Sequence, residues 1–212
     1  EIKTNTENNG ESILSDVAKA VDNKLAQEAI SKDDVQGIGI GVPGPVDSQG
    51  VVHRCVNLGW GVVNVAEELG NLTGLKIKVG NDANVAALGE MWQGGAKGSK
   101  DVIMVTLGTG VGGGIIVDGK VVAGFNGAGG EIGHITVNND EIEACNCGQY
   151  GCLEQYTSAT GIVRLAKRKL AKSTEETSIR EIPNLTAKDV FDAAKAGDAI
   201  AIGLVDEVCE IL

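Results

Sequence analysis

The chain has 212 residues, and 29 acidic side chains against 18 Lys and Arg give it a formal net charge of −11. This balance argues against nucleic acid or an anionic membrane as the main partner, because both are bound through clustered cations. No apolar run approaches the roughly 20 residues of a membrane span, and the N-terminus does not resemble a signal peptide. We therefore expect a cytoplasmic protein that binds neither nucleic acid nor membrane.

The N-terminal half alternates helical and extended patterns. Apolar residues at helical spacing predict an amphipathic helix over 12–30. An alternating segment at 35–42 predicts a strand that ends in the turn Pro43-Gly44-Pro45. A second strand is predicted at 75–79, followed by a helix over 82–90. This alternation is typical of an α/β fold.

From Asp101 the pattern changes. A strand is predicted at 101–107 and a glycine-rich turn at 108–114. Asp118-Gly119, between apolar runs at 115–117 and 121–122, predicts a type I′ hairpin. The remaining predictions are a loop at 124–133, helices at 157–172, 186–196 and 198–212, and a mobile polar linker at 173–184. We expect two lobes: an α/β lobe at 1–97, and part of a larger lobe at 98–212 with the glycine-rich turn, the cysteine-rich segment and the last helices.

The glycine segment at 108–113, Gly-Thr-Gly-Val-Gly-Gly, formally matches a dinucleotide-binding fingerprint. The match fails on context, because a hairpin follows it and the fingerprint requires a helix. An NAD-linked dehydrogenase is disfavoured for this reason. Backbone N–H groups of a strand–glycine–strand hairpin can still hold phosphate, with Mg²⁺ supplying charge that this acidic chain lacks. The alternative is that the glycines only form tight turns or bulges.

A cysteine-rich segment points to metal. His134, Cys145, Cys147 and Cys152 offer one imidazole and three thiolates, the donors of a closed tetrahedral zinc site. The alternative is a set of free or buried thiols. The acidic residues flanking the segment argue against a nucleic-acid-binding zinc module. Cys55 and Cys209 lie apart, and we interpret them as small core residues.

Three carboxylates lie where chemistry would need them. Asp82 follows a predicted strand and opens a helix, Glu131 lies in a glycine-rich loop, and Glu154 follows the last cysteine of the cluster. Carboxylates accept hydrogen bonds from polyols, and one can take a hydroxyl proton as general base. The alternatives are a helix cap for Asp82, an ordinary loop acid for Glu131 and a solvated surface acid for Glu154.

Together these segments resemble the ROK family of sugar kinases and repressors, and most of all its bacterial glucokinases. The resemblance lies in residues 41–45, 57–60, 80–84, 107–114, 130–134 and 145–154. It implies the actin-like (ribonuclease H-like) two-lobed ATPase fold of sugar kinases. It also implies ATP-dependent phosphorylation of a hexose at the entry to glycolysis, with Mg²⁺, a structural Zn²⁺ and a homodimer.

The resemblance assigns roles residue by residue. Asp82 corresponds to the base that takes the proton from the 6-hydroxyl, which then attacks the γ-phosphate of ATP. The residues implied to contact the sugar are Gly44, Asn57, Asn81, Asp82, Glu131, His134 and Glu154, and those implied to contact the ATP phosphates are Gly108, Thr109, Gly110, Gly112 and Gly113. His134 would serve both as sugar contact and zinc ligand. Glucose is the favoured substrate, although kinases for mannose, fructose, N-acetylmannosamine and allose share most of the motifs.

The chain departs from the family pattern at both ends. The family begins with a strand carrying Asp-x-Gly-Gly-Thr, the first phosphate loop, and ends with a region that contacts adenosine; neither is found here. We therefore expect a piece of a longer kinase, incomplete in its fold. The alternative function is a non-catalytic sugar-sensing repressor. Such repressors carry an N-terminal helix-turn-helix domain, which nothing here resembles, and Asn81-Asp82 with the glycine loop favour the enzyme.

Overall fold

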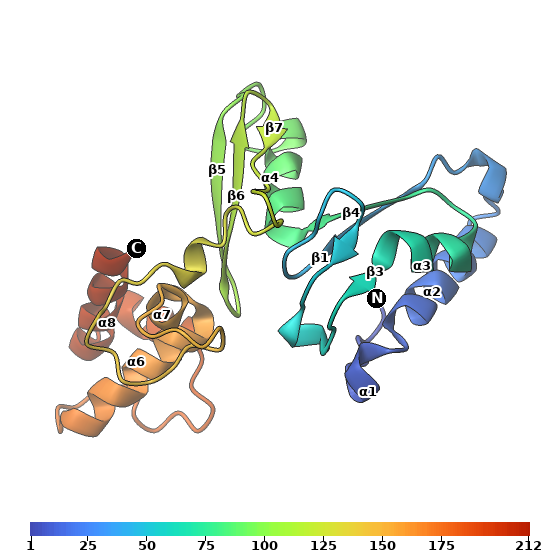
Figure 1. The fold of residues 1–212 in the computed structure, drawn as a ribbon. Coiled ribbons are helices and arrows are strands. Elements are labelled where there is room, and N and C mark those ends of the chain that lie inside the picture. The colour runs from blue at the N-terminus through green and yellow to red at the C-terminus, as the bar shows by residue number, and fades with distance from the viewer. The chain divides into compact units, whose positions relative to one another are not determined.

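The structure is a computed structural model that describes residues 1–55 and 57–212, with helices and strands throughout (Figure 1). The chain forms two compact units. The first comprises Glu1–Met104 and Gly114–Gly130, and the second comprises Val105–Gly113 and Glu131–Leu212. The lobes at 1–97 and 98–212 stay a prediction; the units differ from them in placing 98–104 and 114–130 with the N-terminal segment.

The first unit is built on two parallel strands. Strand β1 (Ile38–Val42) pairs with β4 (Ile77–Asn81), with Ile38 opposite Ile77. Parallel strands need a crossover connection, and this one contains α3 (Val65–Thr73), which packs against α2 (Ile13–Gln27). The shorter elements of this part are α1 (Glu7–Gly10), η1 (Lys32–Asp34), β2 (Val51–Val52), η2 (Val56–Leu58) and β3 (Val63–Asn64).

Helix α3 is missing from the sequence predictions, although both of its ends carry local signals. The Asn64 side chain accepts a hydrogen bond from the Glu67 backbone N–H at 3.2 Å, and Gly74 ends the helix in the left-handed conformation with φ +71°. These are ordinary capping arrangements. The core beside the strands contains Leu14, Val42, Val46, Val52, Cys55, Trp60 and Val65. The prediction that Cys55 is a core residue is confirmed.

The strands β5 (Val102–Leu107), β6 (Val111–Val117) and β7 (Lys120–Val121) form a second sheet in that order. The predicted turn at 108–114 is too long, because β6 begins at Val111 and includes three of the glycines. A Cβ on Gly114 would lie 2.5 Å from the Ala87 Cβ of helix α4 (Asp82–Gln93), so close packing requires a glycine there. The type I′ hairpin is confirmed, since Asp118 and Gly119 have φ values of 51° and 74°.

The second unit is mainly helical. It contains η3 (Ile132–His134), α5 (Glu154–Thr157), α6 (Ala159–Lys172), α7 (Ala187–Lys195) and α8 (Ala199–Ile211). The helix predicted over 157–172 is interrupted, because buried Ser158 ends α5 and caps α6 by accepting from the Gly161 N–H. Cys209 is exposed, so its predicted core position is wrong: the buried stripe of α8 runs through residues 200, 201, 204 and 208.

The segment predicted as a mobile linker, 173–184, is tied to these helices. Ile179 lies in the core with a relative exposure of 1%. Arg180 donates hydrogen bonds to the backbone carbonyls of Leu170, Ser173 and Glu175 at 2.9–3.1 Å. The polar residues on which the prediction of mobility depended lie around Ile179 and Arg180, which anchor the segment.

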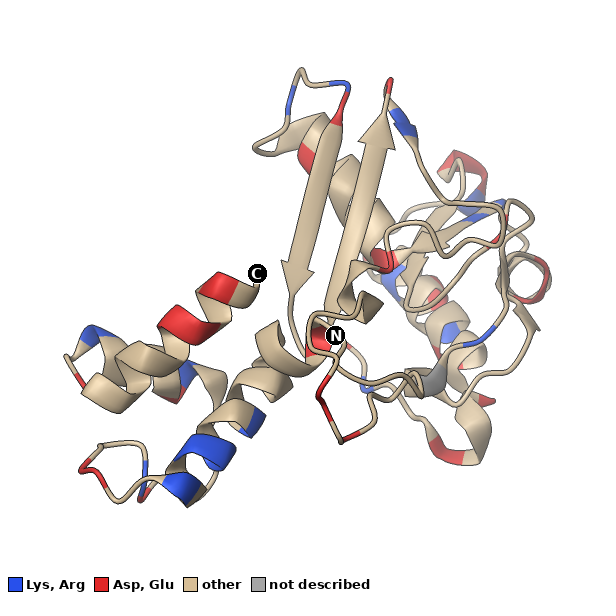
Figure 2. Cartoon of the chain, turned by 60° about the vertical axis from the view of Figure 1, so that its left-hand side comes forward, with Lys and Arg blue, Asp and Glu red and all other residues tan. Residues whose placement is uncertain are grey.

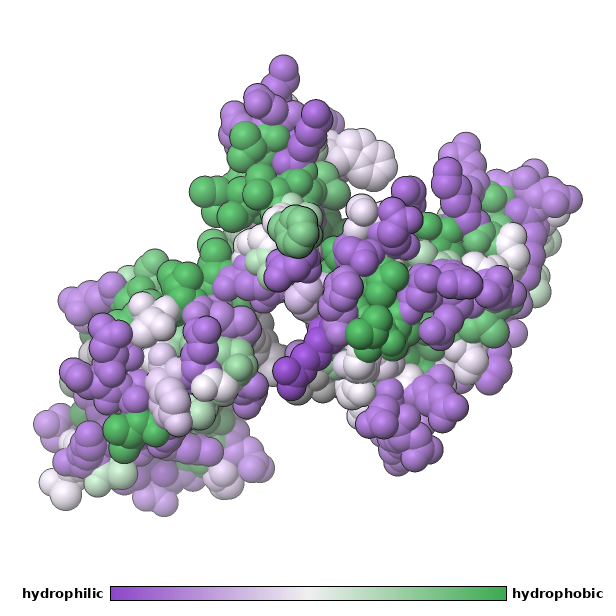
Figure 3. All heavy atoms as spheres, viewed as in Figure 1, coloured by the Kyte–Doolittle hydropathy of each residue, from purple (hydrophilic) through white to green (hydrophobic). Residues whose placement is uncertain are grey.

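Apolar side chains are exposed along β5 (Figure 3). Ile103 is 74% exposed, and Val105 and Leu107 are 42% and 51% exposed. Apolar patches on a protein surface are typical of interaction surfaces.

Among the described residues, no helix is both long enough and apolar enough to cross a membrane.

Candidate active site and metal centre

In the first unit, Asn81 joins the end of β4 to helix α4. Its Oδ1 accepts the Asn84 backbone N–H at 3.1 Å, which caps the helix, and its Nδ2 donates to the Gly44 carbonyl at 3.2 Å. One side chain therefore uses its two ends to hold the helix start and the turn after β1. The predicted residues Gly44 and Asn81 are brought together by this bond.

Asp82 is the first residue of α4, at the carboxyl end of the parallel strands. Its side chain is exposed, and its Oδ1 accepts the N–H of Ala83 at 2.8 Å. Among the residues that the structure describes, no hydrogen bond or ion pair occupies Oδ2. Asp82 is thus an accessible hydrogen-bond acceptor at the start of α4.

The turn around Gly44 lies against the segment that carries Asn57. Gly44 has φ +92°, and a Cβ there would lie 2.5 Å from the Arg54 carbonyl oxygen, so the position accepts only glycine. Asn57 lies in η2 and is exposed. The segment is held by Trp60, which is buried and donates from Nε1 to the Gly10 carbonyl at 3.2 Å. Gly44, the Asn57 segment and Asn81 therefore belong to one locally connected part of the first unit.

In the second unit, the glycine turn Gly108-Thr109-Gly110 is tied to the start of α6. The Gly108 N–H bonds the Gly110 carbonyl at 3.0 Å, the Ala159 N–H bonds the Gly108 carbonyl at 2.9 Å, and Thr160 Oγ1 donates to the Thr109 carbonyl at 3.0 Å. Gly112 and Gly113, also predicted as phosphate contacts, lie in β6. The turn itself is therefore shorter and better anchored than the pattern indicates.

Glu154 connects this turn to the cysteine cluster. Its Oε2 accepts the Val111 N–H at 2.9 Å, and its Oε1 lies 4.0 Å from Cys145 Sγ. A Cβ on Gly110 would lie 2.3 Å from Glu154 Oε2, so glycine makes room for the carboxylate. The interpretation of Glu154 as a solvated surface acid is wrong, because the side chain is half-buried and bonded to the backbone.

Glu131 and His134 lie at the two ends of η3, and both are half-buried. The glycine between them packs tightly, since a Cβ on Gly133 would lie 2.2 Å from the Val111 carbonyl oxygen. This contact positions His134 beside the start of β6 and the cysteine cluster.

His134, Cys145, Cys147 and Cys152 converge. Their ligand atoms all lie within 4.8 Å of one another. Cys147 Sγ and Cys152 Sγ are 3.7 Å apart, and Cys145 Sγ is 3.9 Å from His134 Nδ1. Two thiolates on a tetrahedral Zn²⁺ with bonds of about 2.3 Å would lie about 3.8 Å apart. The geometry and the donor set are therefore compatible with a structural zinc ion.

Burial affects the protonation of two of the cysteines. Burial, together with the thiols of Cys147 and Cys145, raises the pKa of Cys152 to about 12, and burial also raises the pKa of Cys145. Thiols in such surroundings stay protonated at neutral pH unless a metal holds them as thiolates.

A buried ionic cluster beside these ligands is missing from the sequence predictions. Glu141, which the sequence marks only as one of the acidic residues flanking the cysteines, is bonded to Arg164, Arg168 and Tyr156. Figure 2 shows the basic residues gathered on α6. The i, i+4 spacing of Arg164 and Arg168 places them on one helix face, but nothing in the sequence links that face to Glu141.

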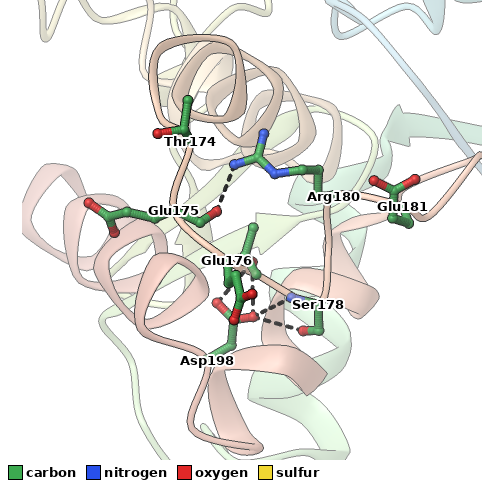
Figure 4. A pocket seen from close by; sticks show the side chains of 8 residues that line it. Thr174, Glu175, Glu176, Ser178, Arg180, Glu181 and Asp198 are labelled. Carbon is green, nitrogen blue, oxygen red and sulfur yellow. Dashed lines mark hydrogen bonds between the residues drawn. The ribbon is translucent and has the colours of Figure 1, made fainter.

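Two surface cavities lie apart from the predicted residues. One, of about 620 Å³, is lined by Thr174–Ser178, Arg180, Glu181 and Asp198 (Figure 4). Asp198 caps α8 there: burial opposes its charge, but hydrogen bonds from Ser178, Ala201 and Thr177 lower its pKa to about 2. The other, of about 990 Å³, lies along α4 beside Leu88 and Trp92. Neither is lined by a predicted site residue.

Comparison with known proteins gives matches along the whole chain. A model of the ROK family matches residues 1–212. The chain is 44% identical to a glucokinase from Halalkalibacterium halodurans over 216 residues, which cover 100% of this chain and 66% of the relative. It thus spans about two thirds of that relative's length.

Solved structures agree in fold. A ROK family glucokinase from Streptomyces griseus, in complex with glucose and AMPPNP, has a TM-score of 0.81 at 34% identity, covering 99% of this chain and 67% of that one. A ROK family transcriptional regulator, a homologue of the E. coli MLC protein, has a TM-score of 0.83 at 27% identity, covering 93% and 50%. The predicted α/β fold of the actin-like ATPase class is confirmed.

Proposed function

This chain belongs to the ROK family, and we propose that the protein is an ATP-dependent hexose kinase that converts glucose to glucose 6-phosphate. The observation that carries the proposal is the 44% identity to a glucokinase over the whole chain. The exposed carboxylate of Asp82 at the end of β4 supports it.

We propose Asp82 as the general base. A carboxylate that takes a hydroxyl proton must lie within hydrogen-bond reach of it and be accessible to substrate. Asp82 is exposed, lies at the N-terminus of α4 and has one oxygen bonded to the Ala83 N–H. It would accept the proton of the 6-hydroxyl as that oxygen attacks the γ-phosphate.

Other polar groups would orient the sugar. We propose that Gly44, Asn57, Asn81, Glu131, His134 and Glu154 bind it, since carboxylates, amides and imidazole suit the hydroxyls of a neutral polyol. The bond between Asn81 and Gly44 supports this role, because it preorganises two of these groups.

The glycine segment would receive phosphate. We propose that backbone N–H groups of Gly108, Thr109, Gly110, Gly112 and Gly113 bind ATP phosphates. Glu154 brings a negative charge to the edge of this turn, through its bond to Val111. Phosphate binding therefore calls for Mg²⁺, which neutralises charge in phosphoryl transfer.

His134, Cys145, Cys147 and Cys152 would hold one structural Zn²⁺. When bound, this ion would supply a rigid cross-link between η3 and the loop that leads to Glu154. A cytoplasmic location and a homodimer stay predictions.

The deciding experiment is a coupled assay on the intact protein. ADP formation with Mg-ATP is measured against glucose, mannose, fructose, N-acetylmannosamine and allose. We expect the highest kcat/KM for glucose. A preference for another hexose would overturn glucose as the assigned substrate. The absence of turnover with every sugar would overturn the kinase assignment.

The alternative function is that of a sugar-sensing repressor, which the structural match to a ROK transcriptional regulator supports. Operator-fragment binding by the intact protein, with and without sugar, tests this. We expect no sugar-sensitive DNA binding, because the identity to a glucokinase, 44% over the whole chain, exceeds that to a xylose repressor, 34% over 83% of the chain.

A further inference from the structure

A buried carboxylate lies at the centre of contacts between the metal-site loop and two helices. The Glu141 side chain is 1% exposed. It accepts hydrogen bonds from Tyr156 Oη at 2.6 Å and from both Nη atoms of Arg168, at 2.9 and 2.8 Å, and it also pairs with Arg164. The Arg168 contact is bidentate, the geometry in which arginine binds carboxylates most specifically.

Neighbouring bonds reinforce this attachment. Asn138 Nδ2 donates to Tyr156 Oη at 2.9 Å. Arg164 Nε donates to Glu143 Oε2 at 2.9 Å, and Gln155 Nε2 donates to the Glu143 carbonyl at 2.9 Å. Residues 138–143 are therefore tied to α5 and α6 at several points along their length.

The attached segment leads directly into the metal ligands. Cys145 and Cys147 follow Glu143 closely in the chain. Among the described residues, the strand-like pairing of this stretch is limited to two isolated bridges, Ala144–Tyr150 and Thr136–Cys152. A loop with so little regular structure keeps its ligands in place only if its backbone is held by other contacts.

We propose that Glu141 is a positioning residue of the metal centre. Held by Arg164, Arg168 and Tyr156, it fastens residues 138–143 to α6, so that Cys145 and Cys147 already face His134 and Cys152 before metal binds. The inference rests on the metal centre proposed above.

The test compares Glu141→Gln with the matched control Glu143→Gln. Both variants remove one negative charge from the same loop and from the same two arginines, but Glu143 is 58% exposed and Glu141 is 1% exposed. Zinc affinity is measured by competition with a chromogenic chelator, using the full chain at a temperature where circular dichroism shows each variant folded. We expect affinity to fall about 10–100-fold in Glu141→Gln and by less than about twofold in the control.

Two milder variants keep the test decisive if Glu141→Gln does not fold. Arg168→Lys retains the charge but loses the bidentate contact, and Tyr156→Phe removes one hydrogen bond to Glu141 while keeping the ring. We expect intermediate losses of zinc affinity in both. At saturating Co²⁺, the ligand-field spectrum of each variant should match that of the wild type, because the ligands are unchanged.

The outcomes are distinguishable. A wild-type chain that takes up no zinc would overturn the proposed metal centre, and the positioning role with it. A wild type that binds zinc, with unchanged affinity in Glu141→Gln or in both milder variants, would overturn the positioning role alone. Equal losses in Glu141→Gln and Glu143→Gln would also overturn it, because they would point to loop charge in general.

Discussion

The region around Asp82 and the loop at 138–152, here called the metal loop, hold their candidate functional groups by different means. Around Asp82, two parallel strands, a helix start and the Asn81 cap define the geometry. The metal loop has almost no regular structure, and a buried ionic cluster and a set of thiols take that place. Backbone hydrogen bonding can therefore build one part of a site, whereas side-chain chemistry must build the other.

The largest expected effect is on the Asp82 side. Asp82→Asn keeps the helix start but removes the proton acceptor, so we expect kcat of the intact protein to fall by about 10²–10⁴-fold with sugar affinity nearly unchanged. Steady-state kinetics and a sugar titration measure the two effects. Glu90→Gln, an acid on the same helix, is the control and should turn over normally; normal turnover in Asp82→Asn would remove Asp82 as base.

Metal removal should loosen the metal loop and leave the region around Asp82 unchanged. Cys152→Ser, or chelation of the wild type, should increase amide exchange across 131–154 by an order of magnitude or more, because the thiols no longer share a cation. Exchange in β4 and α4 should hardly change. Hydrogen exchange with mass spectrometry measures both regions, and equal loosening of the two would show that metal does not stabilise residues 131–154 selectively.

A smaller effect is expected at the cap that organises the Asp82 region. Asn81→Ala removes the cap of α4 and the bond to Gly44, and should lower the free energy of unfolding by about 1–2 kcal/mol. Asn64→Ala, which removes the cap of α3, should cost about 1 kcal/mol. Only the Asn81 variant should raise KM for sugar. An equal KM in both variants would show that Asn81 does not contribute to sugar binding.

The smallest effect concerns acid. The hydrogen bond from Arg168 outweighs burial and, with those from Tyr156 and Arg164, holds the pKa of Glu141 well below its usual range. The unfolded chain therefore takes up the proton first, so this contribution is present above about pH 4.3 and is lost as pH falls toward the folded pKa. The loss between pH 4 and 3 should be about 1 kcal/mol.

Urea unfolding at each pH measures this dependence. The pH slope of Glu141→Gln should be flatter than that of the wild type, because the variant lacks the carboxylate whose pKa is lowered most by the two arginines. Identical slopes would show that Glu141 is not the group that titrates.

Much of the local structure could be predicted because its signals are local. The strand that ends at Asn81, the helix that follows and the Asp118-Gly119 turn all depend on backbone preferences of neighbouring residues. The convergence of His134, Cys145, Cys147 and Cys152 could be predicted from spacing and residue type. The segment at 173–184 could not, because one buried residue, Ile179, outweighs its polar surroundings.

The sequence by itself determined the fold class, the type of most of the long helices and strands, and the chemistry of the candidate residues, since these follow from short-range patterns. Only the tertiary structure decided that Glu154 bonds the backbone beside the glycine turn, that β6 starts at Val111, and that Glu141 is buried against two arginines of α6. Each of these depends on contacts between segments far apart in the chain. The spacing of charged and small residues along a sequence does not specify which distant partner they will meet.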